Sequence, residues 1–298
     1  MADPTESTSV LVIGATGQQG SAVTRSLLAR GLAVHALVRD TERPAARELR
    51  ASGARLVLGD LDDPESLSAA MAGVSGVFAV LTMMMNGPTI TPEGIATEER
   101  RGTTVAEVAA KTGVGHLVYS SVAGASTEST VAHLRSKATI EARIRSLGLP
   151  ATILRPVSFM ENFTTYATPV VTDGTLVVSL AMRPDSPMQL IAVRDIGEFA
   201  AIAFGRPEEF TGQTMVIAGD RLPGTAIAER FGRARGVPAR FQPVPIERLR
   251  AFDEEVARMF EWLDSGDGEL ADLSALRAVH PQLMTLADWL DGRETETR

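Results

Sequence analysis

Short apolar runs alternate along the first half of the chain with amphipathic stretches of helical period. The runs are rich in β-branched residues, which is typical of strands in a parallel sheet that is covered on both faces. They occupy residues 10–13, 33–38, 54–58, 77–81, 116–121 and 149–156. Strands that alternate with helices in this way predict an α/β fold with a doubly wound parallel sheet.

The regular alternation ends after residue 156. We expect a short strand at 175–179, a helix with Asp195 as its N-cap, a strand at 214–218 that returns to the main sheet, and helices over 246–262 and near Leu286. The predicted units are a main domain of residues 1–156, joined by 190–220, and a smaller, mostly helical lid of residues 157–189 and 221–298. The functional site is expected in the cleft between them.

A glycine-punctuated turn, Gly14 to Gly20, links the first strand to the first helix. Its G-x-x-G-x-x-G spacing suits a dinucleotide: Gly14 permits the sharp turn, Gly17 lets the backbone approach a pyrophosphate, and Gly20 lets the helix pack against the strand. The helix N-terminus would then present free N–H groups to the phosphates. A plain tight turn is the alternative, but the position between a strand and a helix favours the dinucleotide.

Charged residues follow the second and third strands. Arg39 stands where such folds place the adenosine ribose, and an arginine there favours the 2′-phosphate of NADP over the 2′-hydroxyl of NAD. A solvated arginine is the alternative, and Asp40 could take the acidic role of an NAD site if the register shifts by one. Asp60, at the end of the third strand, can accept a hydrogen bond from an adenine amine.

Three consecutive methionines, Met83, Met84 and Met85, follow the fourth strand. The carboxyl edge of an open α/β sheet lines the ligand crevice, so these side chains would form an adaptable apolar wall for a substrate. Methionine also fills gaps in protein cores, and this alternative stays open.

One face of the helix expected over 131–147 contains a lysine. His133, Lys137 and Ile140 recur at helical spacing, whereas Glu141 and Arg145 form an i,i+4 pair on another face. Lys137 therefore belongs to the buried stripe, and a buried lysine needs a partner. Ribose hydroxyls and phosphates of a cofactor are the partners that we expect, and a lysine that extends to solvent is the alternative.

Composition narrows the class of protein. The chain has 298 residues, no cysteine, four scattered histidines and a net charge of −8. These features exclude disulfides and thiolate catalysis, give no case for a metal site, and argue against a nucleic-acid partner. A polar N-terminus without a signal-peptide pattern, and the lack of a long apolar run, predict a cytoplasmic protein that is not in a membrane.

The chain resembles the NmrA-like branch of the atypical short-chain dehydrogenases/reductases. The motifs that carry the resemblance are G-A-T-G-Q-Q-G (14–20), L-V-R-D (37–40), G-D-L-D-D (59–63), H-L-V-Y-S-S-V-A-G-A (116–125), S-K-A-T-I-E (136–141), L-R-P-V-S-F-M-E-N-F (154–163) and V-R-D-I-G-E-F-A (193–200). The resemblance implies a Rossmann domain that binds NAD(P) and a small C-terminal domain.

Site residues follow from the resemblance together with the strand ends. The family pattern implies that the glycine turn contacts the pyrophosphate, that Lys137 reaches the nicotinamide ribose, and that Val157 to Phe159 flank the nicotinamide. The expected cofactor contacts are Gly14, Thr16, Gly17, Gln18, Gln19, Gly20, Arg39, Asp60, Leu61, Leu81, Thr82, Ser120, Lys137, Pro156, Val157 and Phe159. The expected substrate contacts are Met83, Met84, Met85, Phe159, Met160 and Asn162.

The chain also departs from the wider family, whose catalytic pair is Tyr-x-x-x-Lys. Here His133 stands in the place of the tyrosine, and Val122 follows the pair Ser120-Ser121 where the family has its catalytic serine. One hypothesis is an NADPH-dependent reductase of a small apolar carbonyl, quinone or activated alkene, with Lys137 in the site and a proton from His133, Tyr119 or water. The other is a non-catalytic NADP(H) sensor that acts through a protein partner. A homodimer is compatible with both.

Overall fold

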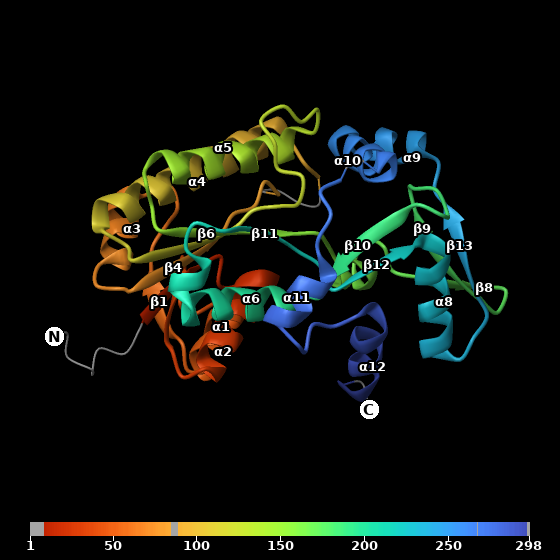
Figure 1. Ribbon diagram of the computed structural model, residues 1–298, viewed down its shortest axis with the longest axis horizontal. Helices are drawn as coiled ribbons and strands as arrows, with labels where there is room; N and C mark the ends of the chain where they lie inside the picture. Colours follow the sequence, from red (N-terminus) through yellow and green to blue (C-terminus); the bar gives the residue numbers. More distant parts are fainter. Residues whose placement is uncertain (1–8, 85–88, 267, 297–298) are drawn as a thin grey trace.

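A seven-stranded parallel sheet forms the centre of the larger unit in the computed structural model, which describes residues 9–84, 89–266 and 268–296 (Figure 1). The strand order is β11-β6-β5-β4-β1-β2-β3. The strands are β1 (Ser9–Ile13), β2 (Ala33–Val38), β3 (Arg55–Leu58), β4 (Gly76–Val80), β5 (His116–Ser120), β6 (Ala151–Pro156) and β11 (Thr214–Ile217). The order reverses between β1 and β4, and such a switch point is where open α/β sheets bind ligands.

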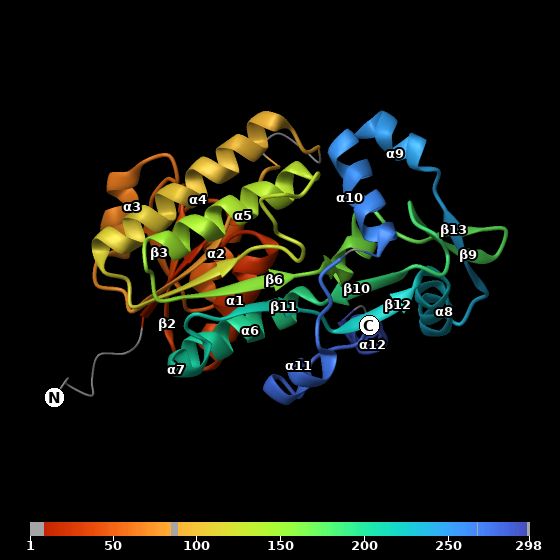
Figure 2. The same ribbon diagram turned by 45° about the horizontal axis from the view of Figure 1, so that its top comes forward.

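Helices cover both faces of this sheet. On one face lie α3 (Pro64–Met71), α4 (Pro92–Thr112) and α5 (Ala132–Ser146), and on the other lie α1 (Gln18–Ala29), α2 (Pro44–Ala51) and α6 (Val193–Gly205), followed by α7 (Pro207–Phe210) (Figures 1 and 2). Successive residues of a strand point to opposite faces. Accordingly Val10 and Val12 belong to the core under α1 and α6, whereas Leu11 and Ile13 belong to the core under α4 and α5. The predicted doubly wound sheet is confirmed.

The smaller unit contains more strand than we expected. Two three-stranded sheets, in the orders β12-β10-β7 and β13-β9-β8, stand beside the helices. The strands are β7 (Ser158–Phe159), β8 (Val170–Thr172), β9 (Thr175–Leu180), β10 (Pro187–Ile191), β12 (Asp220–Pro223) and β13 (Ala239–Pro243), and the helices are η1 (Met160–Thr164), α8 (Gly224–Arg235), α9 (Ile246–Phe252), α10 (Glu254–Ser265) and α12 (Leu286–Glu296). Only the strand near 175–179 was predicted, because the others are short and mix polar with apolar residues.

Two boundaries differ from the sequence prediction. The single helix expected over 246–262 is divided into α9 and α10 at Asp253, whose side chain accepts hydrogen bonds from the N–H groups of Glu255 and Val256 and so starts a new helix. Asp195 is not the N-cap of α6, because the helix begins at Val193. Its buried carboxylate instead accepts hydrogen bonds from the backbone N–H of Met284 at 2.9 Å and contacts Nε2 of His280 at 3.1 Å.

The C-terminal segment is shared between the two units. Leu276 of α11 (Leu273–Val279) and Leu283 pack into the core under α1 and α6, while Leu286 and Trp289 of α12 pack into the core of the smaller unit. The sequence pattern predicted that all of residues 221–298 belong to the lid. The described chain holds no helix long and apolar enough to cross a membrane.

Candidate functional site

The glycine turn has the backbone that its predicted role requires. Gly14 has a φ of +78°, a left-handed conformation that glycine adopts without strain. A Cβ on Gly20 would collide with the carbonyl oxygen of Gly14, so this glycine lets α1 pack against the turn. A Cβ on Gly17 would meet only the Gly14 oxygen, at 3.4 Å, so the space above Gly17 is open. The turn is therefore a cradle that fits a pyrophosphate.

The cradle is connected to the end of β5. Thr16, Gly17 and Gln18 are exposed, whereas Gln19 is half-buried and its Oε1 accepts a hydrogen bond from Oγ of Ser120 at 2.6 Å. Gly17 offers no side-chain oxygen to the first-turn N–H groups of α1. Free N–H groups at a helix N-terminus bind anions, which again fits a phosphate. The structure thus brings these predicted cofactor residues to one edge of the sheet.

Arg39 and Asp60 occupy the ends of β2 and β3. Arg39 is exposed and makes no ion pair or hydrogen bond with the part of the chain that is described. Asp40 is already engaged, because its Oδ1 accepts from the backbone N–H of Glu42 at 2.8 Å and its Oδ2 lies 3.9 Å from Arg43. One oxygen of Asp60 likewise accepts from its own loop, and Leu61 beside it is half-buried. Arg39 is therefore the group at this edge that is free to meet a phosphate.

Lys137 is buried, as its place on the helix stripe predicts, but it has protein partners. Its Nζ donates a hydrogen bond to the carbonyl oxygen of Leu81 at 3.2 Å and lies 3.0 Å from Oε1 of Glu98, a fully buried residue of α4. Oε2 of Glu98 accepts from Oγ of Ser136 at 2.9 Å. The ammonium is thus held at the carboxyl end of β4. Its contact with a ribose stays a prediction.

Glu98 was not predicted from the sequence. The buried residues of α4 include Gly94, Glu98, Gly102 and Val105, which recur every three or four positions. A carboxylate on the buried stripe of a helix is the signal that could have revealed it.

His133 and Tyr119 are both buried near Lys137. Burial, assisted by the positive charge of Lys137, lowers the pKa of His133 to about 4, although Asp253 acts in the opposite direction. Burial raises the pKa of the Tyr119 hydroxyl well above 10, and the negative charges of Glu98 and Glu141 add to this shift. That hydroxyl finds no hydrogen-bond partner among the described residues. Neither group is exposed as a proton donor in this conformation.

The segment after β4 is only partly buried. Leu81 is buried, Thr82 is exposed and its Oγ1 accepts from the backbone N–H of Met84 at 3.1 Å. Met83 is half-buried and Met84 is 43% exposed, so these two methionines are not packed as a core. Met85 lies outside the described residues. The apolar wall that the sequence predicts is open to a ligand at these two positions.

A small pocket lies where β6 leads into the smaller unit. Phe159 and Asn162 line it, together with Ser158, Phe163, Tyr166, Ala167, Leu180, Met188, Met259 and Phe260. Pro156 is buried and Val157 half-buried at its entrance segment. Met160 is fully buried in the core of the smaller unit and does not line the pocket. The predicted substrate residues therefore divide between the loop after β4, this pocket and the core.

Two carboxylates at the start of α10 connect the smaller unit to the larger one, which the sequence did not indicate. Oδ2 of Asp253 accepts from the backbone N–H of Ile90 at 2.8 Å, and Oε2 of Glu255 accepts from that of Ala132 at 2.9 Å. Ile90 lies in the loop that precedes α4, and Ala132 is the first residue of α5. The smaller unit thereby holds the start of both helices.

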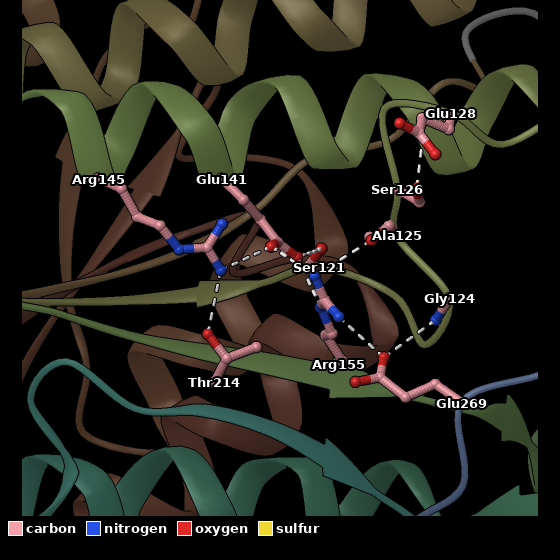
Figure 3. A network of polar contacts seen from close by, with 10 residues as sticks. All are labelled: Ser121, Gly124, Ala125, Ser126, Glu128, Glu141, Arg145, Arg155, Thr214 and Glu269. Atoms are coloured by element: carbon pink, nitrogen blue, oxygen red, sulfur yellow. Dashed lines mark hydrogen bonds and ion pairs between the residues drawn. The ribbon is translucent and has the colours of Figure 1, made fainter.

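A network around Glu141 supports the end of β5 (Figure 3). Its buried carboxylate accepts from Oγ of Ser121 at 2.6 Å and from Arg155 at 2.9 and 2.8 Å. Arg155 also pairs with Glu269 at 2.8 Å, which ties the C-terminal segment to β6. The predicted pair of Glu141 with Arg145 is present at 2.9 Å, but its carboxylate is buried rather than on a solvated face. No cluster of metal-ligating side chains occurs in the described ranges.

Known proteins are similar to this chain in sequence and in architecture. The family model described as "NmrA-like family" matches residues 6–290. The NAD(P)H azoreductase of Xenophilus azovorans is 31% identical over 242 residues, which cover 81% of this chain and 79% of that protein.

Solved structures agree in fold. The negative transcriptional regulator NmrA in complex with NAD has a TM-score of 0.81 at 21% identity, covering 98% of both chains. The NADPH-dependent quinone oxidoreductase of Escherichia coli complexed with NADPH has a TM-score of 0.78 at 21% identity, covering 96% of this chain and 99% of that one. Together with the match over residues 6–290, this shows that the chain belongs to the NmrA-like family.

Proposed function

We propose that this protein is an NADPH-dependent reductase of a small apolar carbonyl, quinone or activated alkene. The observation that carries the proposal is the glycine cradle, which is open at Gly17 and joined to the end of β5 by the hydrogen bond between Ser120 and Gln19. Lys137 is held at the end of the neighbouring strand β4. A relative with azoreductase activity in its name and a structural neighbour that acts as a quinone oxidoreductase support the same class.

The cofactor would be held by the cradle and the two neighbouring strand ends. The open backbone at Gly17 and the first turn of α1 would take the pyrophosphate. Arg39 would pair with the 2′-phosphate, which favours NADP(H) over NAD(H). Lys137, fixed at the Leu81 carbonyl, would donate to the nicotinamide ribose.

The bound nicotinamide would supply the hydride, and the protein residues would orient the substrate and exclude bulk water. Met83, Met84 and Phe159 provide the apolar contacts. A pKa of about 4 leaves His133 neutral at pH 7, with no proton that it readily gives up. Since Tyr119 is also buried, the proton would come from water, and a quinone, which is reduced easily, would need little acid assistance.

The test is NADPH oxidation, followed by absorbance, against a panel of quinones, aldehydes, enones and azo compounds. We expect at least one acceptor class to be turned over, faster with NADPH than with NADH. Lys137→Met should lower turnover or cofactor affinity, while the exposed Lys111→Met should not. Failure to bind either nucleotide would refute the proposal.

A regulator that senses NADP(H) and acts through a protein partner is the second candidate. Apolar side chains are exposed on the smaller unit, with Tyr166 at 68%, Val170 at 61% and Val171 at 56%. Val170 and Val171 belong to β8, an edge strand, and exposed apolar edges commonly mark interaction surfaces. Tight NADPH binding without turnover of any acceptor would favour this candidate.

A further inference from the structure

Lysine is rare in this chain. It has 29 lysines and arginines together, of which only Lys111 and Lys137 are lysines. Lys111 is exposed, whereas the side chain of Lys137 is 7% exposed. Arginine and lysine are not equivalent, because a compact ammonium on a flexible stem fits a site that a planar guanidinium does not. A buried lysine in a chain that otherwise uses arginine indicates that the position requires a compact cation.

Two closely packed helices place a carboxylate beside this lysine. α4 and α5 lie side by side on the sheet (Figures 1 and 2). A Cβ on Gly102 would collide with the side chain of Ile140, so the glycine sets how closely the helices approach. Glu98 lies one turn before Gly102, and Ser136 lies one turn before Ile140. This close approach places Glu98 against Ser136 and Lys137.

Three acidic residues act on the surroundings of Lys137: Glu98 directly, Asp253 through His133 and Glu141 through Tyr119. Glu98 is 3.0 Å from Nζ, and the ring of Tyr119 on β5 has its centroid 5.6 Å from it. His133, one turn earlier on α5, has its pKa lowered to about 4 by burial and by the charge of Lys137. Glu98 is thus the anion in contact with Lys137. Nζ donates one hydrogen bond, to the Leu81 carbonyl, and pairs with Glu98 by charge, because Oε1 of Glu98 accepts no hydrogen bond from the described residues. An ammonium has three N–H donors, so donors remain for a ligand.

We propose that Glu98 is a positioning residue: its buried carboxylate keeps Lys137 charged and holds Nζ at the Leu81 carbonyl, so that an N–H that is not bonded to the protein is presented to a ligand. Ser136 fixes the carboxylate by donating to its other oxygen. Without Glu98 the lysine would be an uncompensated charge in a dry site, and its neutral form would be favoured. The role in cofactor orientation rests on the function proposed above, but the charge of Lys137 does not.

The experiment uses the full chain with lysine labelled at ¹³Cε, whose chemical shift reports the charge of the side chain. Two signals are expected, and Lys111→Arg assigns them. In Glu98→Gln the Lys137 signal should titrate at a lower pH than in the wild type, by roughly one to three pH units. Glu98→Asp, which keeps the charge, should recover most of that difference. Glu107→Gln removes an exposed ion pair, at 2.7 Å, between the same two helices and should leave the titration of the Lys137 signal unchanged.

An unchanged Lys137 titration in folded Glu98→Gln would overturn the proposal. If that variant does not fold, Glu98→Gln combined with Lys137→Met should fold again, because the uncompensated charge has gone. A double variant as unfolded as the single one would also overturn it. In the nucleotide assay, Glu98→Gln should weaken NADPH binding or turnover at least tenfold, and more at high pH. A wild type that binds no NADPH would refute the proposed function and leave the lysine titration valid.

Discussion

Acidification from pH 7 to pH 5 should destabilise the protein through two buried histidines, His116 and His133. Burial lowers the pKa of each from 6.5 to about 4. Nε2 of His116 lies 2.8 Å from Oγ1 of Thr152, and that hydroxyl donates its hydrogen to the carbonyl of Phe210. The ring must therefore donate from Nε2. Protonation would bury a second N–H, on Nδ1, which has no acceptor among the described residues.

The magnitude follows from the two pKa values. Because the folded pKa lies below the unfolded one, the unfolded state binds more protons between pH 6.5 and 4, so stability is present above 6.5 and is lost as pH falls toward 4. Between pH 7 and pH 5 each histidine should lower the free energy of unfolding by about 2 kcal/mol, and the two together by about 4 kcal/mol. Carboxylates with lowered pKa values, such as Glu198, lose their contribution only below about pH 4.5.

The assay is urea unfolding at pH 7, 6 and 5 of the wild type, His116→Gln and His133→Gln. Glutamine does not titrate, and at position 116 its amide can still donate to Thr152. Between pH 7 and pH 5 the free energy of unfolding of each variant should fall by about 2 kcal/mol less than that of the wild type. His35→Gln is the control, since His35 is only half-buried and its pKa, lowered by burial and by Arg55, should matter less. A wild-type pH dependence in His116→Gln would show that this reasoning is wrong.

Three further predictions concern the cradle, the cofactor and the core. Arg39→Ala should reduce the preference for NADP over NAD by about 10- to 150-fold in paired titrations, whereas Arg43→Ala should not; an unchanged ratio would make Arg39 a surface residue. Gly17→Val should abolish nucleotide binding with little loss of thermal stability, and wild-type affinity would contradict the cradle. Glu141→Gln should cost about 3 kcal/mol of unfolding free energy, measured against Glu107→Gln, because it removes the buried charge that pairs with Arg155 and leaves Arg155, among the described residues, only Glu269 as an acidic partner, which is 40% exposed.

The main sheet was predictable because each of its elements is specified by residues that are close together in the sequence. Each strand is a short apolar run, and the helices between them carry their own signals: α2 begins at Pro44, α3 is capped by Asp63, and the chain after α1 turns left-handed at Gly31. The smaller unit was harder because its strands are held by distant partners. β13 pairs with β9 across some sixty residues, which no local pattern reveals.

The candidate site likewise contains residues that a local motif predicts and residues that come from distant parts of the chain. The cradle is a contiguous motif, so its glycines could be assigned roles from spacing, and the structure shows the turn at Gly14 and the close packing at Gly20. Asp253 and Glu255, which hold the backbone at Ile90 and Ala132, lie more than a hundred residues away from them. Their role depends on how the smaller unit sits on the larger one, and a pattern along the chain does not contain that information.

Lys137 illustrates why burial predicted from one helix is not enough to assign a role. The helical stripe correctly indicated that this lysine is buried and needs a partner, and a cofactor was the partner expected. The structure instead supplies Glu98 from a neighbouring helix. The two partners are compatible, because an ammonium with one anion and one carbonyl still has a donor to offer. The protein partner makes the charge possible before any ligand arrives, so a site of this kind can be preorganised rather than assembled by its cofactor.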